Sequence, residues 1–134
     1  MKKELQDKLF NKYPEIFVQK DLSMKETAMC WGISCGDGWY RIIDTLCDTI
    51  QQHVANVNRN KPNENFTCQA VQVKEKFGGL RFYTYGGDEY IDGAISLAES
   101  MSYLTCSECG NKASSPQRDR GWIYTLCIHC RNEE

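Results

Sequence analysis

The chain has 134 residues, of which 41% are hydrophobic and 25% charged, and its formal net charge at pH 7 is -2. This size and balance predict one globular domain without low-complexity segments. The small negative charge excludes a protein that coats nucleic acid or anionic membranes by general electrostatic attraction. No run approaches the ~18 apolar residues of a membrane span, and the first six residues lack an apolar signal, so we expect a cytoplasmic protein.

The N-terminal third predicts two short helices. Residues 3–12 have apolar side chains on one side of a helix, and Pro14 then interrupts the pattern. Ser23-Met24-Lys25-Glu26 reads as a capping box, in which serine and glutamate satisfy each other's free backbone donors. It predicts a brief helix running to about Ile33.

A longer helix is predicted after the break at Cys35-Gly36-Asp37-Gly38, with Asp37 as its N-cap. It covers residues 38–57 and is expected to be the core helix, because apolar residues recur at helical spacing. These residues are Trp39, Ile43, Leu46, Ile50, Val54 and Val57.

The middle of the chain predicts a β-hairpin. Residues 58–65 form a polar loop, and residues 66–77 and 80–85 are rich in β-branched and aromatic side chains. Gly78-Gly79 joins these two segments. A two-residue glycine joint is a hairpin signal because both residues can take positive φ.

Asp88 is the expected N-cap of a last helix over residues 89–104, which buries Ile91, Ile95, Ala98 and Met101. The predicted fold is therefore α+β, with helices packed on a β-hairpin or small antiparallel sheet and with a C-terminal zinc ribbon. We expect a body over residues 1–104, with its hairpin at 66–85, and a ribbon appendage over 105–134 packed on that body.

The zinc ribbon is predicted from two cysteine pairs with seventeen residues between them, Cys106/Cys109 and Cys127/Cys130. Four thiolates suit the tetrahedral shell of one structural Zn²⁺, and Gly110 allows the backbone to turn so that both sulfurs of the first pair face one ion. A disulfide framework fits a reducing compartment poorly. His129 is an alternative ligand, but we expect it to face solvent.

The hairpin also carries the candidate ligand-binding residues. With Gly78-Gly79 as the turn, Lys76 lies opposite Arg81, and strand alternation separates two faces. The apolar face holds Val71, Val73, Phe77, Leu80 and Phe82, with Glu75 as an awkward member. The other face holds Lys74, Lys76, Arg81, Tyr83 and Tyr85.

This second face is a candidate site for an anionic small molecule or an acidic protein surface. Like charges held opposite each other across two strands are unfavourable, and an anion would offset their repulsion. The alternative is a solvated outer face whose lysines bend away or pair with Glu89 and Asp92.

Other side chains give weaker indications. Cys30, Cys35, Cys47 and Cys68 are expected to be buried thiols, with a second metal site as the alternative. His53 is expected to be structural, and Trp122 and Tyr124 to pack over the metal site. No nucleophile, phosphate-loop or deaminase motif is present, which argues against an enzyme. A metal-dependent hydrolase would need an open zinc or a second metal.

Three segments together give a resemblance: Cys35–Tyr40, Lys74-Glu75-Lys76-Phe77-Gly78-Gly79-Leu80-Arg81-Phe82-Tyr83, and the cysteine pairs around Gly121-Trp122-Ile123. The chain resembles small proteins of unknown function from bacteria, phages and prophages. The resemblance implies a regulatory or host-interaction protein, acting in the host cytoplasm if phage-encoded. The expected function is non-catalytic capture of a nucleotide signal or an acidic protein surface. A nucleic-acid-binding ribbon using Arg118, Arg120 and Arg131 is the alternative. The oligomeric state is left open.

Overall fold

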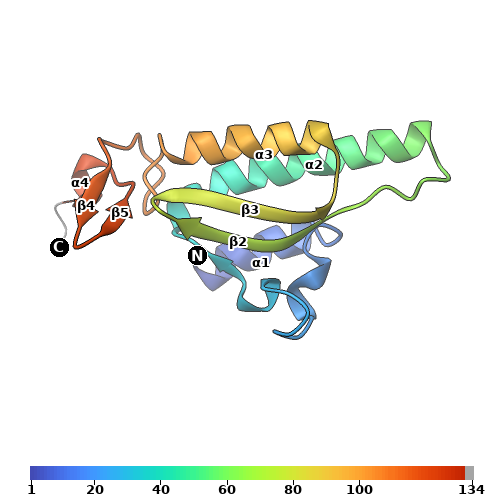
Figure 1. The fold of residues 1–134 in the computed structure, drawn as a ribbon, viewed down its shortest axis with the longest axis horizontal. Helices are drawn as coiled ribbons and strands as arrows, with labels where there is room; N and C mark the ends of the chain where they lie inside the picture. Colours follow the sequence, from blue (N-terminus) through green and yellow to red (C-terminus); the bar gives the residue numbers. More distant parts are fainter. Residues whose placement is uncertain (132–134) are drawn as a thin grey trace.

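The structure, a computed structural model, describes residues 1–131 and has the α+β fold that the sequence predicts (Figure 1). Its helices are α1 (Lys3–Lys12), α2 (Tyr40–Asn60), α3 (Glu89–Ser102) and α4 (Ile128–Arg131), with short 3-10 helices at Val18–Asp21, Met29–Trp31 and Asp37–Trp39. Its strands are β1 (Ile33–Ser34), β2 (Cys68–Lys76), β3 (Gly79–Gly86), β4 (Gln117–Asp119) and β5 (Trp122–Tyr124).

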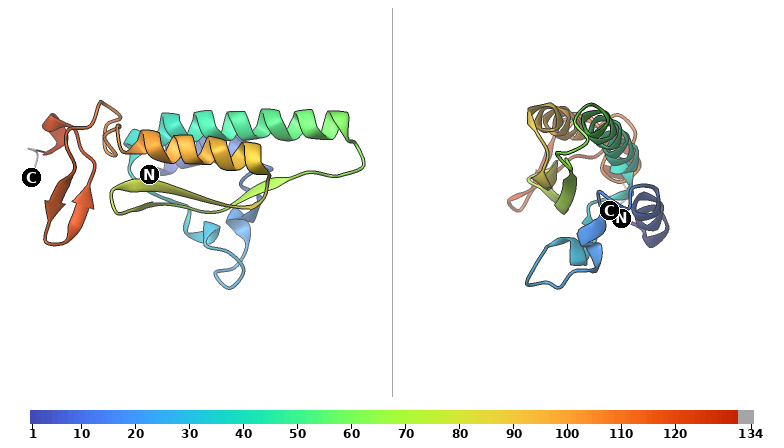
Figure 2. Two further views of the ribbon diagram at one scale, coloured as in Figure 1. Left: turned by 45° about the horizontal axis from the view of Figure 1, so that its top comes forward. Right: turned by 90° about the vertical axis from the view of Figure 1, so that its right-hand side faces the viewer.

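The main sheet has the order β1-β2-β3, with β1 parallel to β2 and β3 antiparallel to it. Helices α2 and α3 run side by side along this sheet, and the β4–β5 hairpin stands at one end of the molecule (Figure 2). One core joins α1, α2, α3 and the sheet, with Leu9, Trp39, Ile43 and Leu80 fully buried. No helix of the described residues is long and apolar enough to cross a membrane.

The predicted core helix exists but begins differently. Asp37 does not cap it: the Asp37 carboxylate accepts the backbone N–H of Lys2 (2.7 Å), and residues 37–39 form a 3-10 turn. The aspartate therefore holds the N-terminal segment instead of the helix end.

The helix predicted from the capping box is wrong. Glu26 Oε2 does accept the backbone N–H of Ser23 (3.4 Å), but only turns and a three-residue 3-10 helix follow. The hydroxyl of Thr27 accepts the N–H of Met29 and donates to the carbonyl of Val71, which diverts the chain toward β2. Ile33 then enters β1, a strand too short to be recognised in the sequence.

The hairpin turn is Phe77-Gly78, one residue earlier than predicted. Both residues have positive φ (53° and 82°), as in a type I′ turn. Lys76 therefore pairs with Gly79, and Lys74, not Lys76, lies opposite Arg81. Pairing moves by two residues, so the alternation of faces is preserved except at a bulge near Val71, which is only half-buried.

The shifted turn accounts for the positions of two residues that were predicted to lie on the apolar face. Phe77 is not in the core; it occupies the turn and is 66% exposed. Glu75 is satisfied because its Oε1 accepts the backbone N–H of Gly78 (2.7 Å) and so holds the turn. Gly79 does not supply turn geometry: a Cβ there would collide with the ring of Tyr103, which packs directly on the hairpin.

Helix α3 is capped by Asp88 as predicted, through the N–H of Ile91 (3.1 Å). Asp88 also lies 2.7 Å from His53 Nε2, and the His53 ring stacks on Tyr90, so this histidine has the structural place expected of it. Met101 is exposed, contrary to prediction, and Ser102 is buried in its place.

Buried Ser102 protects the sheet edge. Its Oγ accepts the N–H of Leu80 and Glu99 Oε2 accepts the N–H of Phe82, each at 2.9 Å. Side chains of α3 thus replace a fourth strand along β3.

Replacing Phe77 with asparagine should stabilise the protein. A bulky residue at φ 53° is strained, whereas asparagine accepts the left-handed region readily. We expect Phe77→Asn to raise the free energy of unfolding by about 1 kcal/mol in urea denaturation. Tyr85→Asn, at an exposed strand position, is the control and should give no gain. Equal losses in both variants would show that the turn stores no strain.

Candidate metal centre and ligand-binding face

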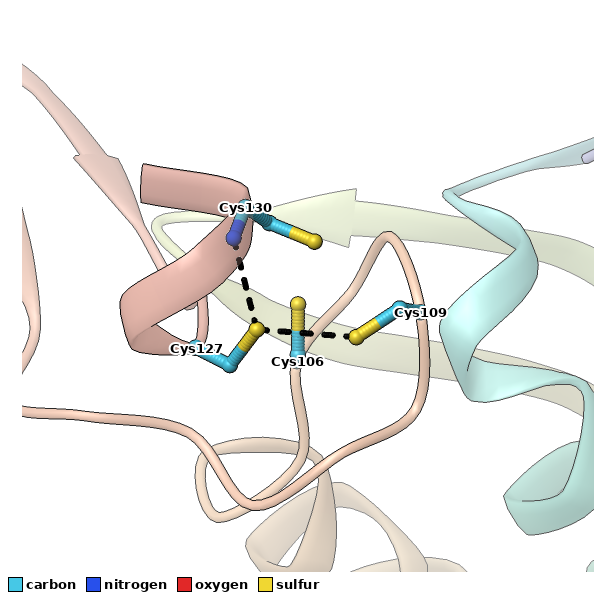
Figure 3. A group of neighbouring side chains, drawn as sticks. All are labelled: Cys106, Cys109, Cys127 and Cys130. Atoms are coloured by element: carbon cyan, nitrogen blue, oxygen red, sulfur yellow. Dashed lines mark hydrogen bonds between the residues drawn. The ribbon is translucent and has the colours of Figure 1, made fainter. Parts of the chain in front are cut away.

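The four predicted metal ligands come together. Cys106 and Cys109 lie in the loop after α3, Cys127 and Cys130 lie at the beginning of α4, and all four sulfurs point toward one another (Figure 3). Their Sγ atoms lie within 4.8 Å of one another, and no other such group of His, Cys, Asp or Glu occurs within residues 1–131. His129 is exposed and outside this group.

The donor set fits a tetrahedral ion of zinc's size. Bonds of about 2.3 Å to four thiolates place neighbouring sulfurs about 3.8 Å apart. The Sγ atoms of Cys109 and Cys127 are 3.6 Å apart. Gly110 has φ 83° and its N–H donates to the carbonyl of Cys106 (3.0 Å), so it makes the turn that was predicted for it. Four thiolates complete such a shell, which is the arrangement of structural zinc.

Backbone N–H groups lower the pKa of two of the four cysteines, Cys106 (against the opposing effect of burial) and Cys127. The N–H of Cys130 donates to the sulfur of Cys127 (3.4 Å) and lowers the pKa of Cys127 to about 6. The cysteines of the body differ, because burial raises the pKa of Cys35 to about 12 and that of Cys68 to about 11. Hydrogen bonding with the Cys109 sulfur raises the pKa of Cys130, so the centre combines lowered and raised thiol pKa values. The thiolate is the form that binds metal. The body cysteines form no metal-ligand group in the part of the chain that the structure describes.

The first cysteine pair sits on the Cys35-Gly36-Asp37-Gly38 turn. The N–H of Gly38 donates to the carbonyl of Ser107 (2.9 Å). A Cβ on Gly36 would collide with the same carbonyl, and one on Gly38 with the carbonyl of Cys106. Sequence reasoning treated this turn as a helix break; two glycines flanking one residue were the available signal of close backbone contact.

Two further contacts join the ribbon to the body. Trp39, fully buried, donates its indole N–H to the carbonyl of Thr105 (2.9 Å). Thr125 donates its hydroxyl to the carbonyl of Gly78 (2.5 Å), so the ribbon contacts the turn of the β2–β3 hairpin. The boundary between residues 104 and 105 remains a prediction.

Trp122 and Tyr124 of the ribbon were predicted to pack over the metal centre, but both are exposed. Trp122 is 67% exposed and Tyr124 is 40% exposed. Both lie on the face of the β4–β5 hairpin where Asp119 pairs with Trp122, whereas Arg118 pairs with Ile123 on the opposite face. Ile123, on the opposite face, lies against Gly78 in the turn of the β2–β3 hairpin.

We call Lys74, Lys76, Arg81, Tyr83 and Tyr85 the basic-aromatic face. The observed register places all five on one side of the sheet. Tyr83 and Tyr85 are exposed, as is Lys76, while Lys74 and Arg81 are half-buried. Within residues 1–131, no carboxylate lies within 4.0 Å of these three cations, so the pairing with Glu89 or Asp92 that the alternative interpretation allowed is absent.

Arg81 is held in place by neutral groups. Its guanidinium donates to the carbonyl of Leu80 (2.9 Å) and to the hydroxyl of Tyr103 (3.1 Å). The hydrogen bond to Tyr103 raises the pKa of Arg81 further above its ordinary value. Because Gly79 admits the Tyr103 ring, the glycine indirectly positions the arginine.

Two of the cavities described below lie away from this face, and a third is lined by its Arg81 and Tyr83. One of about 470 Å³ lies between α2, the segment leading into β2 and the residues after α1. Its lining includes Glu15, Gln51 and Asn58 but no lysine or arginine, so it offers no cation to an anionic ligand. Neither Lys74 nor Lys76 lines this cavity or the two smaller grooves beside α3.

Comparison of the chain with models of protein families, with curated proteins and with solved structures gave no match.

A methyl group on Gly38 should disrupt the seat of the metal centre. Gly38→Ala is expected to lower the free energy of unfolding by about 2 kcal/mol or more, because its Cβ would meet backbone atoms that cannot move independently. Gly93→Ala in α3 is the matched control: nothing lies within 4 Å of its Cβ, and it should stabilise by about 0.5–1 kcal/mol. Urea denaturation of both variants measures the difference. Similar behaviour of the two would contradict the close contact at Gly38.

Metal analysis tests the four-cysteine centre directly. The purified protein should contain one zinc ion per chain by elemental analysis, and Cys109→Ser should lose it because a neutral hydroxyl is a poor substitute for a thiolate. Cys30→Ser is the matched control, since a hydroxyl can also donate to the carbonyl of Thr27 as this thiol does. Equal metal contents in the two variants would exclude the assignment.

Proposed function

We propose that this protein is a non-catalytic, zinc-stabilised binding module that captures an anionic partner on its basic-aromatic face. The zinc acts as a structural ion, because the four thiolates leave no position for a catalytic water. The observation that carries the proposal is the pairing of Lys74 with Arg81 across two strands, with no carboxylate of residues 1–131 within 4.0 Å of either cation.

This pairing is unfavourable in the free protein. Side chains directly opposite on antiparallel strands have Cβ atoms about 5 Å apart, and like charges there repel each other. Arg81 cannot turn away freely because Leu80 and Tyr103 hold its guanidinium. An anion between the two side chains would convert the repulsion into two attractive contacts.

The shape of the face favours an acidic protein surface over a small nucleotide. Small ligands usually occupy concave sites, whereas Lys74 and Lys76 line none of the three cavities described above. The groove that Arg81 does line also contains Asp92 and Glu99, which would repel phosphate. In a bacterial or phage setting, such capture would serve a regulatory or host-interaction role.

The alternative, a nucleic-acid-binding ribbon, is less well supported. Stacking on Trp122 and Tyr124 requires cations beside the aromatic rings to hold the backbone phosphates. Asp119 occupies the position opposite Trp122, and Arg118 lies on the other face.

Substitutions at the like-charge pair should separate stability from binding. Lys74→Ala is expected to stabilise the free protein by several tenths of a kcal/mol, because it removes the repulsion. The same change and Arg81→Ala should each weaken binding to a fluorescent poly-glutamate peptide by about tenfold or more at low salt. Fluorescence anisotropy measures the affinity, and a panel of nucleotides in a thermal-shift assay tests the small-molecule version.

The control is Lys25→Ala, which removes an exposed lysine away from the basic-aromatic face. Its effect should be small. If it weakens peptide binding as much as Arg81→Ala does, attraction by total charge is sufficient and the site assignment fails.

A further inference from the structure

Helix α3 carries two apolar stripes, one buried inside the molecule and one largely exposed, although Tyr90 of the second stacks on His53 and Ala94 touches the core. Ile91, Ile95, Ala98 and Ser102 are buried against the sheet and α2. The second stripe consists of Tyr90, Ala94, Leu97, Met101 and, just after the helix, Leu104. Tyr90, Leu97 and Leu104 are 58%, 63% and 69% exposed, which is unusual for side chains of this size at regular spacing.

The spacing of the second stripe is that of helix pairs that pack along their length. Its members follow one another at intervals of four, three, four and three residues, as the apolar positions of a coiled coil do. A scattered set of exposed apolar residues would have no such period. The period therefore shows that these side chains share one face of α3.

A groove runs beside this stripe and is also apolar. It has a volume of about 240 Å³ and lies between α2 and α3, lined by Leu46 and Thr45 of α2 and by Leu97 and Met101 of α3. The stripe and the groove thus belong to one face, where the two helices run side by side (Figure 2). A helix placed on this face would bury the stripe and fill the groove.

The face is complementary to itself. Tyr90 and Leu104 lie seven residues before and after Leu97, so the stripe is nearly symmetric about that leucine. Two copies of α3 packed antiparallel would set Leu97 against Leu97 and Tyr90 against Leu104. A two-fold contact requires the same patch on both copies, and this patch meets that requirement.

Opposite charges at the two ends of the α2–α3 face agree with the antiparallel arrangement. Arg41 lines the groove near the beginning of α2, which lies at the same end as the C-terminus of α3 (Figure 1). Glu89 opens α3 at the other end. Both are exposed and neither forms an ion pair within the described residues. In an antiparallel pair, Arg41 of each copy approaches Glu89 of the other.

We propose that the α2–α3 face is the interface of a two-fold homodimer, in which the exposed α3 stripes of two copies pack antiparallel about Leu97. The interface leaves Lys74, Lys76 and the rest of the basic-aromatic face uncovered, because those side chains project from the sheet. A dimer would therefore present two such faces.

Sedimentation over a concentration series tests the interface in the full chain. The wild-type protein should dimerise with a dissociation constant on the order of 10–100 µM, as expected for a small contact. Leu97→Glu should remain monomeric throughout, because it places two carboxylates against each other at the symmetry axis. Leu22→Glu, at a 42% exposed position off this face, is the matched control and should dimerise like the wild type.

Charge reversal tests the orientation. Arg41→Glu should weaken dimerisation by about tenfold, and the double variant with Glu89→Arg should restore it. Far-UV circular dichroism checks that each variant is folded. A wild-type protein that is monomeric at about 1 mM, or a dimer that survives Leu97→Glu, overturns the proposal. Failure of the double variant to recover overturns the antiparallel arrangement.

Discussion

The architecture depends on the close backbone contact between the loop of the first cysteine pair and the two glycines Gly36 and Gly38. The backbone of the metal loop approaches these glycines so closely that neither position admits a side chain. The same turn leads directly from β1 into the residues that begin α2. An ion bound by the four cysteines would therefore also fix the end of the sheet and the beginning of the core helix. A chain of this size buries a limited core, so such a constraint adds stability where packing alone supplies little.

The candidate ligand-binding face also depends on a close contact at a glycine, here between Gly79 and the Tyr103 ring. Gly79 allows the Tyr103 ring to lie on the hairpin, and Tyr103 in turn holds Arg81 opposite Lys74. The hairpin tip is held from both sides, by Glu75 within the strand and by Thr125 from the ribbon. These contacts keep Lys74 and Arg81 together although their charges repel. Neutral groups thus hold Arg81 in position, which costs less desolvation free energy than a buried ion pair would.

Sequence reasoning succeeded where a local rule determines the structure. The helical spacing of Ile43, Leu46 and Ile50 and the Asp88 cap each depend on neighbours a few residues apart, and both predictions were confirmed. The two cysteine pairs also lie together as predicted. It failed where a distant group competes for the same atoms. The Asp37 carboxylate accepts the N–H of Lys2 instead of capping α2. No helix follows the capping box at Ser23, because Thr27 hydrogen-bonds to β2. Gly79 makes room for the Tyr103 ring and is not part of the turn. The exposure of Trp122 had no local signal at all, since packing of the ribbon on the hairpin tip is visible only in three dimensions.

The hydrogen bond from Thr125 to Gly78 connects the metal centre with the hairpin that carries the basic-aromatic face. Thr125 is two residues before Cys127, and Gly78 is part of the turn that sets the register of Lys74 and Arg81. If the proposed ion and anion both bind, this contact would couple them, because an ion that holds the ribbon in place would also hold the turn. Coupling of this kind is reciprocal: if the proposed acidic partner binds, it would change the affinity for zinc by the same factor by which zinc changes the affinity for that partner. The structural ion would then act as an effector of binding as well as a staple.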